Sequence, residues 1–472
     1  MSRRPLAVIG LDCAPPALVF HRLRQGLPHL AGLMDRGRWG ELASTIPPIT
    51  VPAWMCLATG RDPGQLGLYG FRNRRDHSYA ELSLASGRDI ESPTLWDLAG
   101  EAGLTSVVLG VPLTYPPRPI KGALVAGPLT PDKSADFTRP RALKPLLDRW
   151  AEGDYLIDVK NFRQAPPAEL AAQLDDMARR RFQVAQRLLK RFGPEVFMMV
   201  EMSPDRLHHA FWGYSDPDHP AYDPAGPWRG VIAEHYRQLD QHLGRLLAAM
   251  DPDTLVLVVS DHGARPLKGG LAVNQWLINQ GLLRLKRPPA KPTALTHDMI
   301  DWPRTRVWST GGYYARLFFN LAGREPAGVI GPRELDAFKA ELTAALEQMT
   351  GPSGEPLGNQ VLDPRDVYRR VRPVAPDLIL YPGGLDLRAV GQVWPGRGAD
   401  HLVPGNDTGA DHANHDPRGI LIAGLAGDRP LAAAGQPVHG ASILDLLPSA
   451  LQWLGLAAPA GLAGRAWDWL CT

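Results

Sequence analysis

The sequence has little cysteine, almost no excess charge and no long hydrophobic run. Its 472 residues include three cysteines and no CxxC pair, which excludes a disulfide framework and a thiolate zinc finger and favours a reducing, cytoplasmic location. The 51 Lys and Arg nearly balance the 49 Asp and Glu, which argues against a nucleic-acid scaffold. The apolar run from Leu6 to Leu11 falls far short of the roughly 20 residues of a membrane helix. We therefore expect no membrane span and no targeting segment.

Short apolar runs without polar alternation recur along the chain, which is typical of strands buried on both faces of a parallel sheet. Between them, residues 168–192 and 231–250 carry apolar side chains at three- and four-residue spacing, the pattern of amphipathic helices. This alternation of strands and helices predicts an α/β fold. The predicted strands begin at Leu6, Thr105, Glu195, Thr254 and Asp377.

Two Pro-rich stretches interrupt the alternation and are expected to be insertions. Residues 128–167 are rich in Pro and charge, and residues 283–373 open with the run KRPPAKP. Either stretch can fold over the mouth of a site, and we expect residues 283–373 to be the cap. The catalytic core then comprises residues 1–282 and 374–472.

Polar side chains stand where the predicted strands end. Asp12 follows the first strand, and Asp261 and His262 follow the strand from Thr254. Ligands bind at the carboxyl edge of open α/β sheets, so these side chains are expected to share a site. Taken singly, Asp12 is equally typical of a helix cap, and His262 of a capped turn.

Asp205 and His209 lie four residues apart after the strand from Glu195. On a helix, that spacing places both side chains on one face, within reach of one cation. A surface helical pair has the same spacing, so the pair alone remains ambiguous. His412 and His415 offer further imidazoles before the next apolar run.

Thr50 precedes Val51 and Pro52 and an apolar segment that we expect to be helical. Thr followed by Pro is a helix-start pattern, and a helix start presents free N–H groups and the positive dipole end to an anion. A hydroxyl placed there can serve as a nucleophile if its pKa is lowered. A plain helix cap is the alternative.

Oxygen and imidazole donors without thiolate suit Zn²⁺ or Mn²⁺, and six or seven ligands suit two ions. Two cations together can activate a nucleophile and offset charge on a transferring phosphoryl group. The sequence therefore favours two-metal phosphoryl chemistry.

The sequence resembles the alkaline phosphatase superfamily, and within it the type I phosphodiesterase/nucleotide pyrophosphatase branch. The resemblance rests on blocks that occur in order: VIGLD, TVPAWMCLATGRDPGQLGLYGF, PDRLHHAFW, SDHG with VNQWL, IDWPRTRVWS, NLAGREPAG and ILDLLPSALQWLGL. It implies an alkaline-phosphatase-like α/β fold with a mostly parallel central sheet, helices on both faces and an inserted cap. It also implies a metal-dependent hydrolase of phosphoric esters with a small-molecule substrate.

The resemblance assigns roles by position. Thr50 would be the nucleophile, forming a phosphothreonyl intermediate that water cleaves. His415 rather than His412 would be a ligand, because it lies four residues before Gly419, as in the family. Two divalent ions would bind, with Zn²⁺ favoured and Mn²⁺ possible. The expected ligands are Asp12, Asp261, His262 and Thr50 for one ion, and Asp205, His209 and His415 for the other.

The chain departs from nucleotide pyrophosphatases at Ala53, where they have an Asn that binds a phosphate oxygen. Loss of such a donor costs about 2.7–4 kcal/mol of transition-state stabilisation. Lys268 and Arg324 are candidate substitutes, with ordinary surface cations as the alternative. A phosphomonoesterase, a phosphomutase, a sulfatase and a non-catalytic metal-binding protein remain the alternatives to a phosphodiesterase.

Overall fold

The computed structural model describes residues 4–470 except residues 220, 397, 406, 407 and 410. The chain folds into two compact units, each assembled from separate stretches of sequence. The first comprises residues 1–71, 85–264 and 415–472, and the second residues 72–84 and 265–414. The range predicted to be a cap, 283–373, falls inside the second unit, and 128–167 falls inside the first. Their roles as cap and insertion stay predictions.

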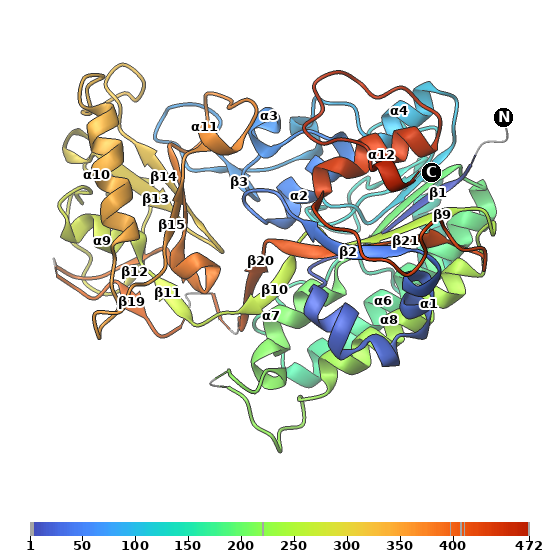
Figure 1. The fold of residues 1–472 in the computed structure, drawn as a ribbon. Coiled ribbons are helices and arrows are strands. Elements are labelled where there is room, and N and C mark those ends of the chain that lie inside the picture. The colour runs from blue at the N-terminus through green and yellow to red at the C-terminus, as the bar shows by residue number, and fades with distance from the viewer. Residues whose placement is uncertain (1–3, 220, 397, 406–407, 410, 471–472) are drawn as a thin grey trace. The chain divides into compact units, whose positions relative to one another are not determined.

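The first unit is built on one mostly parallel sheet, confirming the predicted fold class (Figure 1). In its middle, β1 (Leu6–Leu11) lies between β8 (Val196–Glu201) and β9 (Leu255–Val259) and runs parallel to both. Every residue of these three strands is buried. Because parallel neighbours end at the same edge, the residues that follow β1, β8 and β9 meet there.

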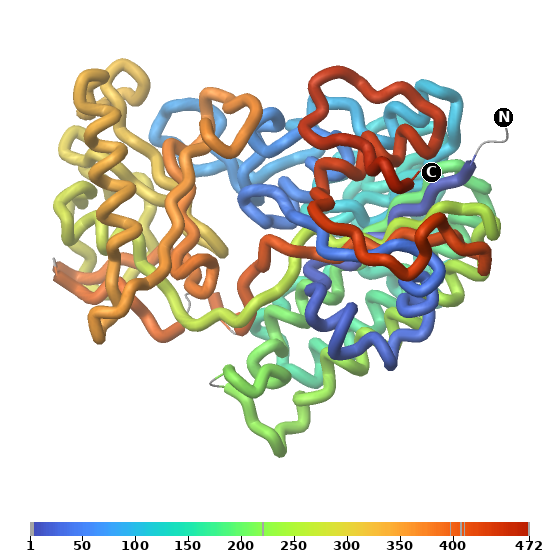
Figure 2. Tube along the Cα trace, viewed as in Figure 1, coloured from blue at the N-terminus to red at the C-terminus, as the bar shows by residue number. Residues whose placement is uncertain are grey.

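Six further strands of the described chain complete this sheet in the order β22-β2-β21-β9-β1-β8-β5-β6-β7. The strand β21 runs antiparallel to β9, so the C-terminal segment lies beside the centre of the sheet (Figure 2). The six are β2 (Arg38–Ala43), β5 (Ser106–Leu109), β6 (Gly122–Val125), β7 (Thr138–Arg139), β21 (Arg418–Leu425) and β22 (Ala441–Ser442).

Helices cover both faces of the sheet (Figure 1). On one face α8 packs against α6, α7 and α1, and α6 also packs against α7; on the other face α12 packs against α2 and α4. The predicted helices at 168–192 and 231–250 are confirmed as α6 and α8, each with a long buried stripe. The bounds are α1 (Pro28–Arg36), α2 (Thr50–Thr59), α4 (Leu95–Glu101), α6 (Pro167–Phe192), α7 (Ser203–Ser215), α8 (Val231–Leu247) and α12 (Leu446–Trp453).

The second unit has its own sheet and its own hydrophobic core. Its strands β13 (Val307–Thr310), β14 (Ala315–Phe319), β16 (Leu378–Tyr381) and β15 (Gln360–Leu362) pair antiparallel. The placement of the run from Asp377 in the main parallel sheet was wrong, since this run forms β16. A continuous apolar run reports burial on both faces but carries no information on the direction of its neighbours.

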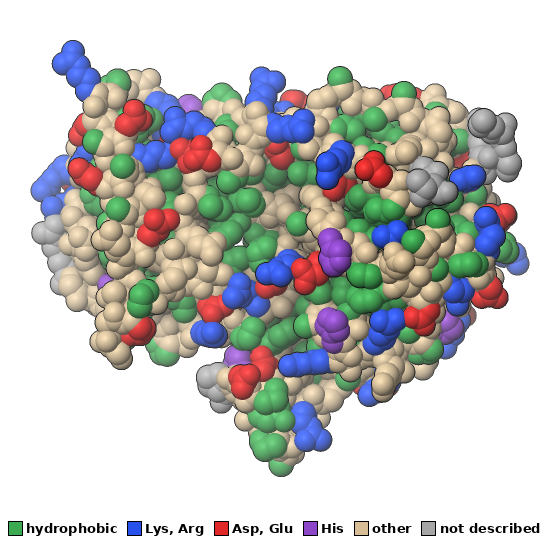
Figure 3. All heavy atoms as spheres, in the orientation of Figure 1, with side chains coloured by type: hydrophobic (Ala, Val, Ile, Leu, Met, Phe, Trp, Pro, Cys, Tyr) green, Lys and Arg blue, Asp and Glu red, His purple; other side chains and the backbone are tan. Residues whose placement is uncertain are grey.

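Charged side chains of both signs are interspersed on the face drawn in Figure 3. This distribution accords with the near balance of acidic and basic residues in the sequence. Across the described residues, no helix combines the length and the apolar character that crossing a membrane requires.

Candidate active site

Six side chains that can ligate a metal gather at the carboxyl edge of the main sheet. They form two buried groups, and within each group the candidate ligand atoms all lie within 4.8 Å of one another. All six belong to the first unit. The first group is Asp12, Asp261 and His262, and the second is Asp205, His209 and His415.

In the first group, Nε2 of His262 lies 3.2 Å from Oδ2 of Asp261 and 3.7 Å from Oδ1 of Asp12. Within the described chain, these two carboxylate oxygens are buried and have no hydrogen bond. The other oxygen of each of these two carboxylates accepts a hydrogen bond. Trp54 Nε1 donates to Asp12 Oδ2 at 2.6 Å, and the Cys13 backbone N–H donates to Asp261 Oδ1 at 3.2 Å.

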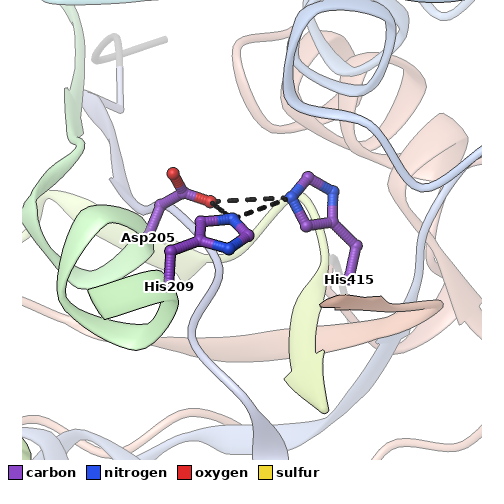
Figure 4. Close-up of side chains that lie close together, drawn as sticks. All are labelled: Asp205, His209 and His415. Atoms are coloured by element: carbon purple, nitrogen blue, oxygen red, sulfur yellow. Dashed lines mark hydrogen bonds and ion pairs between the residues drawn. The ribbon is translucent and has the colours of Figure 1, made fainter. Parts of the chain in front are cut away.

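The second group repeats this pattern (Figure 4). Asp205 Oδ1 lies 3.3 Å from His209 Nε2 and 3.8 Å from His415 Nε2, and the two Nε2 atoms are 3.3 Å apart. Arg206 donates to Asp205 Oδ2, whereas Oδ1 has no hydrogen bond from any described residue. His415 Nδ1 donates to the Pro48 carbonyl at 2.7 Å, which leaves the Nε2 lone pair directed at the group.

The electrostatics of the first group favour a cation. Burial, then repulsion from Asp261 and Asp205, raises the pKa of Asp12 well above its usual range. Burial also raises the pKa of Asp261, and it lowers the pKa of His262 to about 4. The His262 ring is therefore neutral at pH 7, and its Nδ1 donates to the Gly263 carbonyl at 3.1 Å. Buried carboxylates and imidazole lone pairs converging on one point fit a divalent metal ion.

Thr50 lies beside the first group, with Oγ1 3.2 Å from His262 Nε2. It is the first residue of α2, one position later in the helix than the sequence predicted, and its side chain makes no cap to the helix. The preceding Ile49 is extended, and the positive helix end adjoins the Thr50 hydroxyl. In the first turn only Thr50 and Val51 offer N–H groups to a ligand, because Pro52 has none and the Ala53 N–H donates to the Ile49 carbonyl. The arrangement suits a nucleophile that receives an anionic group.

Three contacts at the site were not predicted from the sequence: Trp54 on Asp12, the Cys13 N–H on Asp261 and Arg206 on Asp205. Trp54 lies four residues after Thr50, which places both on one face of a helix. No sequence pattern identified Asp12 as the partner of this indole, because the contact joins residues 42 positions apart.

The predicted substrate contacts both lie in the second unit. Lys268 Nζ pairs with Asp386 at 2.8 Å. Arg324 makes two bonds of 2.7 Å to Asp377 and also contacts Glu325. Their part in binding substrate stays a prediction.

The sequence profile of the type I phosphodiesterase/nucleotide pyrophosphatase family matches residues 6–413. The chain belongs to this family. Family membership confirms the predicted resemblance to this branch, and the protein is a metal-dependent hydrolase of phosphoric ester bonds. No curated protein matches the chain significantly.

Solved structures show the same fold at low sequence identity. Phosphonoacetate hydrolase from Sinorhizobium meliloti 1021, in complex with phosphonoformate, superposes with a TM-score of 0.60 at 16% identity, covering 97% of this chain and 96% of that one. Human ectonucleotide pyrophosphatase/phosphodiesterase 5 superposes with a TM-score of 0.55 at 14% identity, covering 99% and 98%. These likenesses establish that this phosphodiesterase-family chain has an alkaline-phosphatase-like fold.

Proposed function

We propose that the chain is a two-metal phosphodiesterase that cleaves its substrate through a phosphothreonyl intermediate at Thr50. One observation carries the proposal: in each buried Asp of the site, one oxygen is held by an N–H donor, while the other has no hydrogen bond and faces an imidazole Nε2. The Thr50 hydroxyl lies beside this array. Such a donor set with an adjacent hydroxyl suits phosphoryl transfer.

Asp12, Asp261 and His262, with Thr50 Oγ1, would hold one ion. Asp205, His209 and His415 would hold the other. Three imidazoles and three carboxylates without thiolate favour Zn²⁺ and also accept Mn²⁺. When bound, the ions would supply positive charge that lowers the pKa of a neighbouring hydroxyl and offsets charge on the phosphoryl group.

Thr50 then acts as the nucleophile. Its Oγ1 loses its proton and bonds to phosphorus as the bond from phosphorus to the leaving oxygen breaks, and that oxygen takes up a proton and departs as the alcohol. The N–H groups of the first turn of α2 favour the anionic phosphoryl group at this position. Water next attacks phosphorus, the bond to Oγ1 breaks, and a phosphomonoester leaves with Thr50 restored.

Replacing Thr50 tests the nucleophile. We expect Thr50→Ala to lower the rate of bis(p-nitrophenyl) phosphate hydrolysis by at least about 10³-fold, because no other hydroxyl replaces Oγ1. Ion content should persist, since three protein ligands remain at that ion, and Thr50→Ser should retain part of the activity. Wild-type rates in Thr50→Ala would refute the assignment.

A substrate panel tests the reaction class. The panel contains a phosphodiester, a phosphomonoester, a nucleotide, a sulfate ester and phosphonoacetate, the last because of the similar hydrolase structure. Fastest turnover of the diester, with either Zn²⁺ or Mn²⁺, supports the proposal. Faster turnover of any other member would replace phosphodiesterase by the corresponding activity.

A further inference from the structure

Beneath the second ligand group, three polar side chains from three helices form a hydrogen-bonded relay. His235 of α8 lies between Asp175 of α6 and Ser203 of α7. Its Nδ1 is 2.5 Å from Asp175 Oδ1 and its Nε2 is 2.8 Å from Ser203 Oγ. Ser203 is fully buried and His235 is 3% exposed, whereas Asp175 reaches the surface with a side-chain exposure of 37%.

The donors and acceptors of the relay can be assigned. A carboxylate only accepts, so His235 Nδ1 carries a proton and donates to Asp175. In the neutral imidazole, His235 Nε2 accepts from the Ser203 hydroxyl. The Ser203 backbone N–H donates to Glu201 Oε1 at 2.9 Å, at the end of β8. Ser203, the first residue of α7, is thus fixed through both its backbone and its side chain.

The order Asp, His, Ser matches that of a hydrolytic triad, but the burial of Ser203 excludes contact with a substrate. The relay holds the start of α7. This helix carries Asp205 and His209, two and six residues beyond Ser203. We propose that Asp175 and His235 are positioning residues for the second metal ion, acting through Ser203. The inference rests on the proposed two-metal function.

The relay restricts rotation of α7 about its own axis. Apolar packing would hold α7 against α6 and α8 but would tolerate small rotations about the helix axis, whereas hydrogen bonds fix a direction. Asp205 and His209 lie on α7, while His415 lies on β20 (Ala413–Asp416), a separate element. A rotation of α7 therefore changes the distances from Asp205 Oδ1 and His209 Nε2 to His415 Nε2, now 3.8 and 3.3 Å.

Asp205 itself has a second anchor. Arg206 donates to Asp205 Oδ2 and, at 2.8 Å, to Asp158 Oδ2. The relay and this anchor both contact the first turn of α7. The first ligand group has no member on α7, since Asp12 follows β1 and Asp261 follows β9. Loss of the relay is therefore expected to weaken binding of the second ion and to leave binding of the first ion unchanged.

The test is calorimetric titration of Zn²⁺ into the metal-free full-length protein, with no activity readout. In His235→Ala and in the smaller change Ser203→Ala, we expect the Kd of the second ion to rise about 10–100-fold, the usual cost of removing a partner behind a ligand. The Kd of the first ion should stay within about twofold, inside ordinary variation between variants. His415→Ala removes a proposed ligand of the second ion, and the binding step that it weakens in the titration is therefore the step of that ion.

His242→Ala is the matched control. His242 lies on α8 two turns beyond His235, and its ring stacks on Phe182 with the centroids 5.6 Å apart. Its removal takes an imidazole from the same helix without touching Ser203, so both Kd values should match the wild type. Thermal unfolding of each metal-free variant verifies that it folds.

The outcomes separate the two proposals. Selective loss of the second ion in both relay variants supports the positioning role. Two-ion binding that is unchanged in both variants, or weakened equally at both ions, overturns the relay while the two-metal proposal stands. A wild-type protein that binds fewer than two ions overturns the two-metal proposal and the relay with it.

Discussion

In each buried carboxylate of the site, the oxygen that does not face an imidazole accepts a hydrogen bond from a different kind of donor. Asp12 accepts from the neutral Trp54 indole, Asp261 from a backbone N–H, and Asp205 from the Arg206 guanidinium. These donors set the rotamer of each Asp and hence the direction of the oxygen that faces the imidazoles. Loss of such a partner commonly costs about 10–100-fold in metal affinity.

Trp54→Phe is expected to weaken the first ion about 10–100-fold, because Asp12 Oδ2 loses its donor while the ring still fills the core. Titration of Zn²⁺ into the metal-free variant measures the change. Trp453→Phe is the control, since its indole donates at 3.1 Å to the Pro5 carbonyl and contacts no ligand. Equal affinities in the wild type and Trp54→Phe would contradict the positioning role of this indole.

The pH dependence of stability should include a contribution from His208, a buried neighbour of the proposed ligands. Burial lowers its pKa from 6.5 to about 3. As the pH falls from 6.5 to 4, the unfolded chain binds a proton there and the folded chain does not, so folding loses stability. Above pH 6.5 His208 does not change the free energy of unfolding. Between pH 6.5 and pH 4 it lowers this free energy by about 3 kcal/mol.

His208→Gln should remove this part of the acid destabilisation. Urea unfolding of the metal-free protein between pH 7 and 4, with chelator present, measures the free energy of both forms. We expect the variant to lose less stability than the wild type across that range. Parallel pH profiles would show that His208 does not titrate as its burial requires.

At the scale of elements, the site depends on close packing between β1 and α2. Gly10 of β1 lies under the Trp54 ring, and a Cβ added there would lie 2.3 Å from Trp54 Cη2 and 2.9 Å from Val200 Cγ2. Only glycine allows this approach. The same contact brings the indole to the strand that precedes Asp12, so packing and ligand orientation are coupled.

Gly10→Ala should therefore destabilise the protein by about 1–3 kcal/mol, the usual range for an overpacked core, and also weaken the first ion. Urea unfolding measures the first effect and Zn²⁺ titration the second. Gly230→Ala is the control, because a Cβ there meets no described atom within 4 Å. A Gly10→Ala protein with wild-type stability would mean that the strand and helix separate without cost.

At the scale of the whole molecule, the two units carry separate hydrophobic cores, and both proposed ions belong to the first unit. A ligand stabilises only the part of a protein whose unfolding releases it. Metal binding is therefore expected to act on the two units unequally.

Scanning calorimetry with and without Zn²⁺ tests this expectation. At a free ion concentration of 1,000 Kd, each site adds about 4 kcal/mol to the stability of the first unit. Its unfolding transition should move to higher temperature, while that of the second unit stays in place. Asp261→Asn should reduce the shift, and equal shifts in both transitions would contradict independent unfolding.

Much of the first unit was predictable, because its strands and helices leave local signals. The run from Leu6 to Leu11 is β1 without change, and the predicted helices match α6 and α8 within a few residues. The run from Asp377 was misplaced because strand direction depends on partners far away in the sequence. The helix start at Thr50 was predicted to within one residue, because Thr and Pro restrict the backbone locally.

The sequence by itself determined the donor types, their positions after buried strands, and the family. These follow from residue identity and short-range spacing. Only the tertiary structure decided which oxygen of each Asp faces the imidazoles, and that Trp54 contacts Asp12, Arg206 contacts Asp205 and His235 contacts Ser203. Those contacts join distant segments or depend on rotamers, and both are set by packing of the whole core rather than by any local pattern.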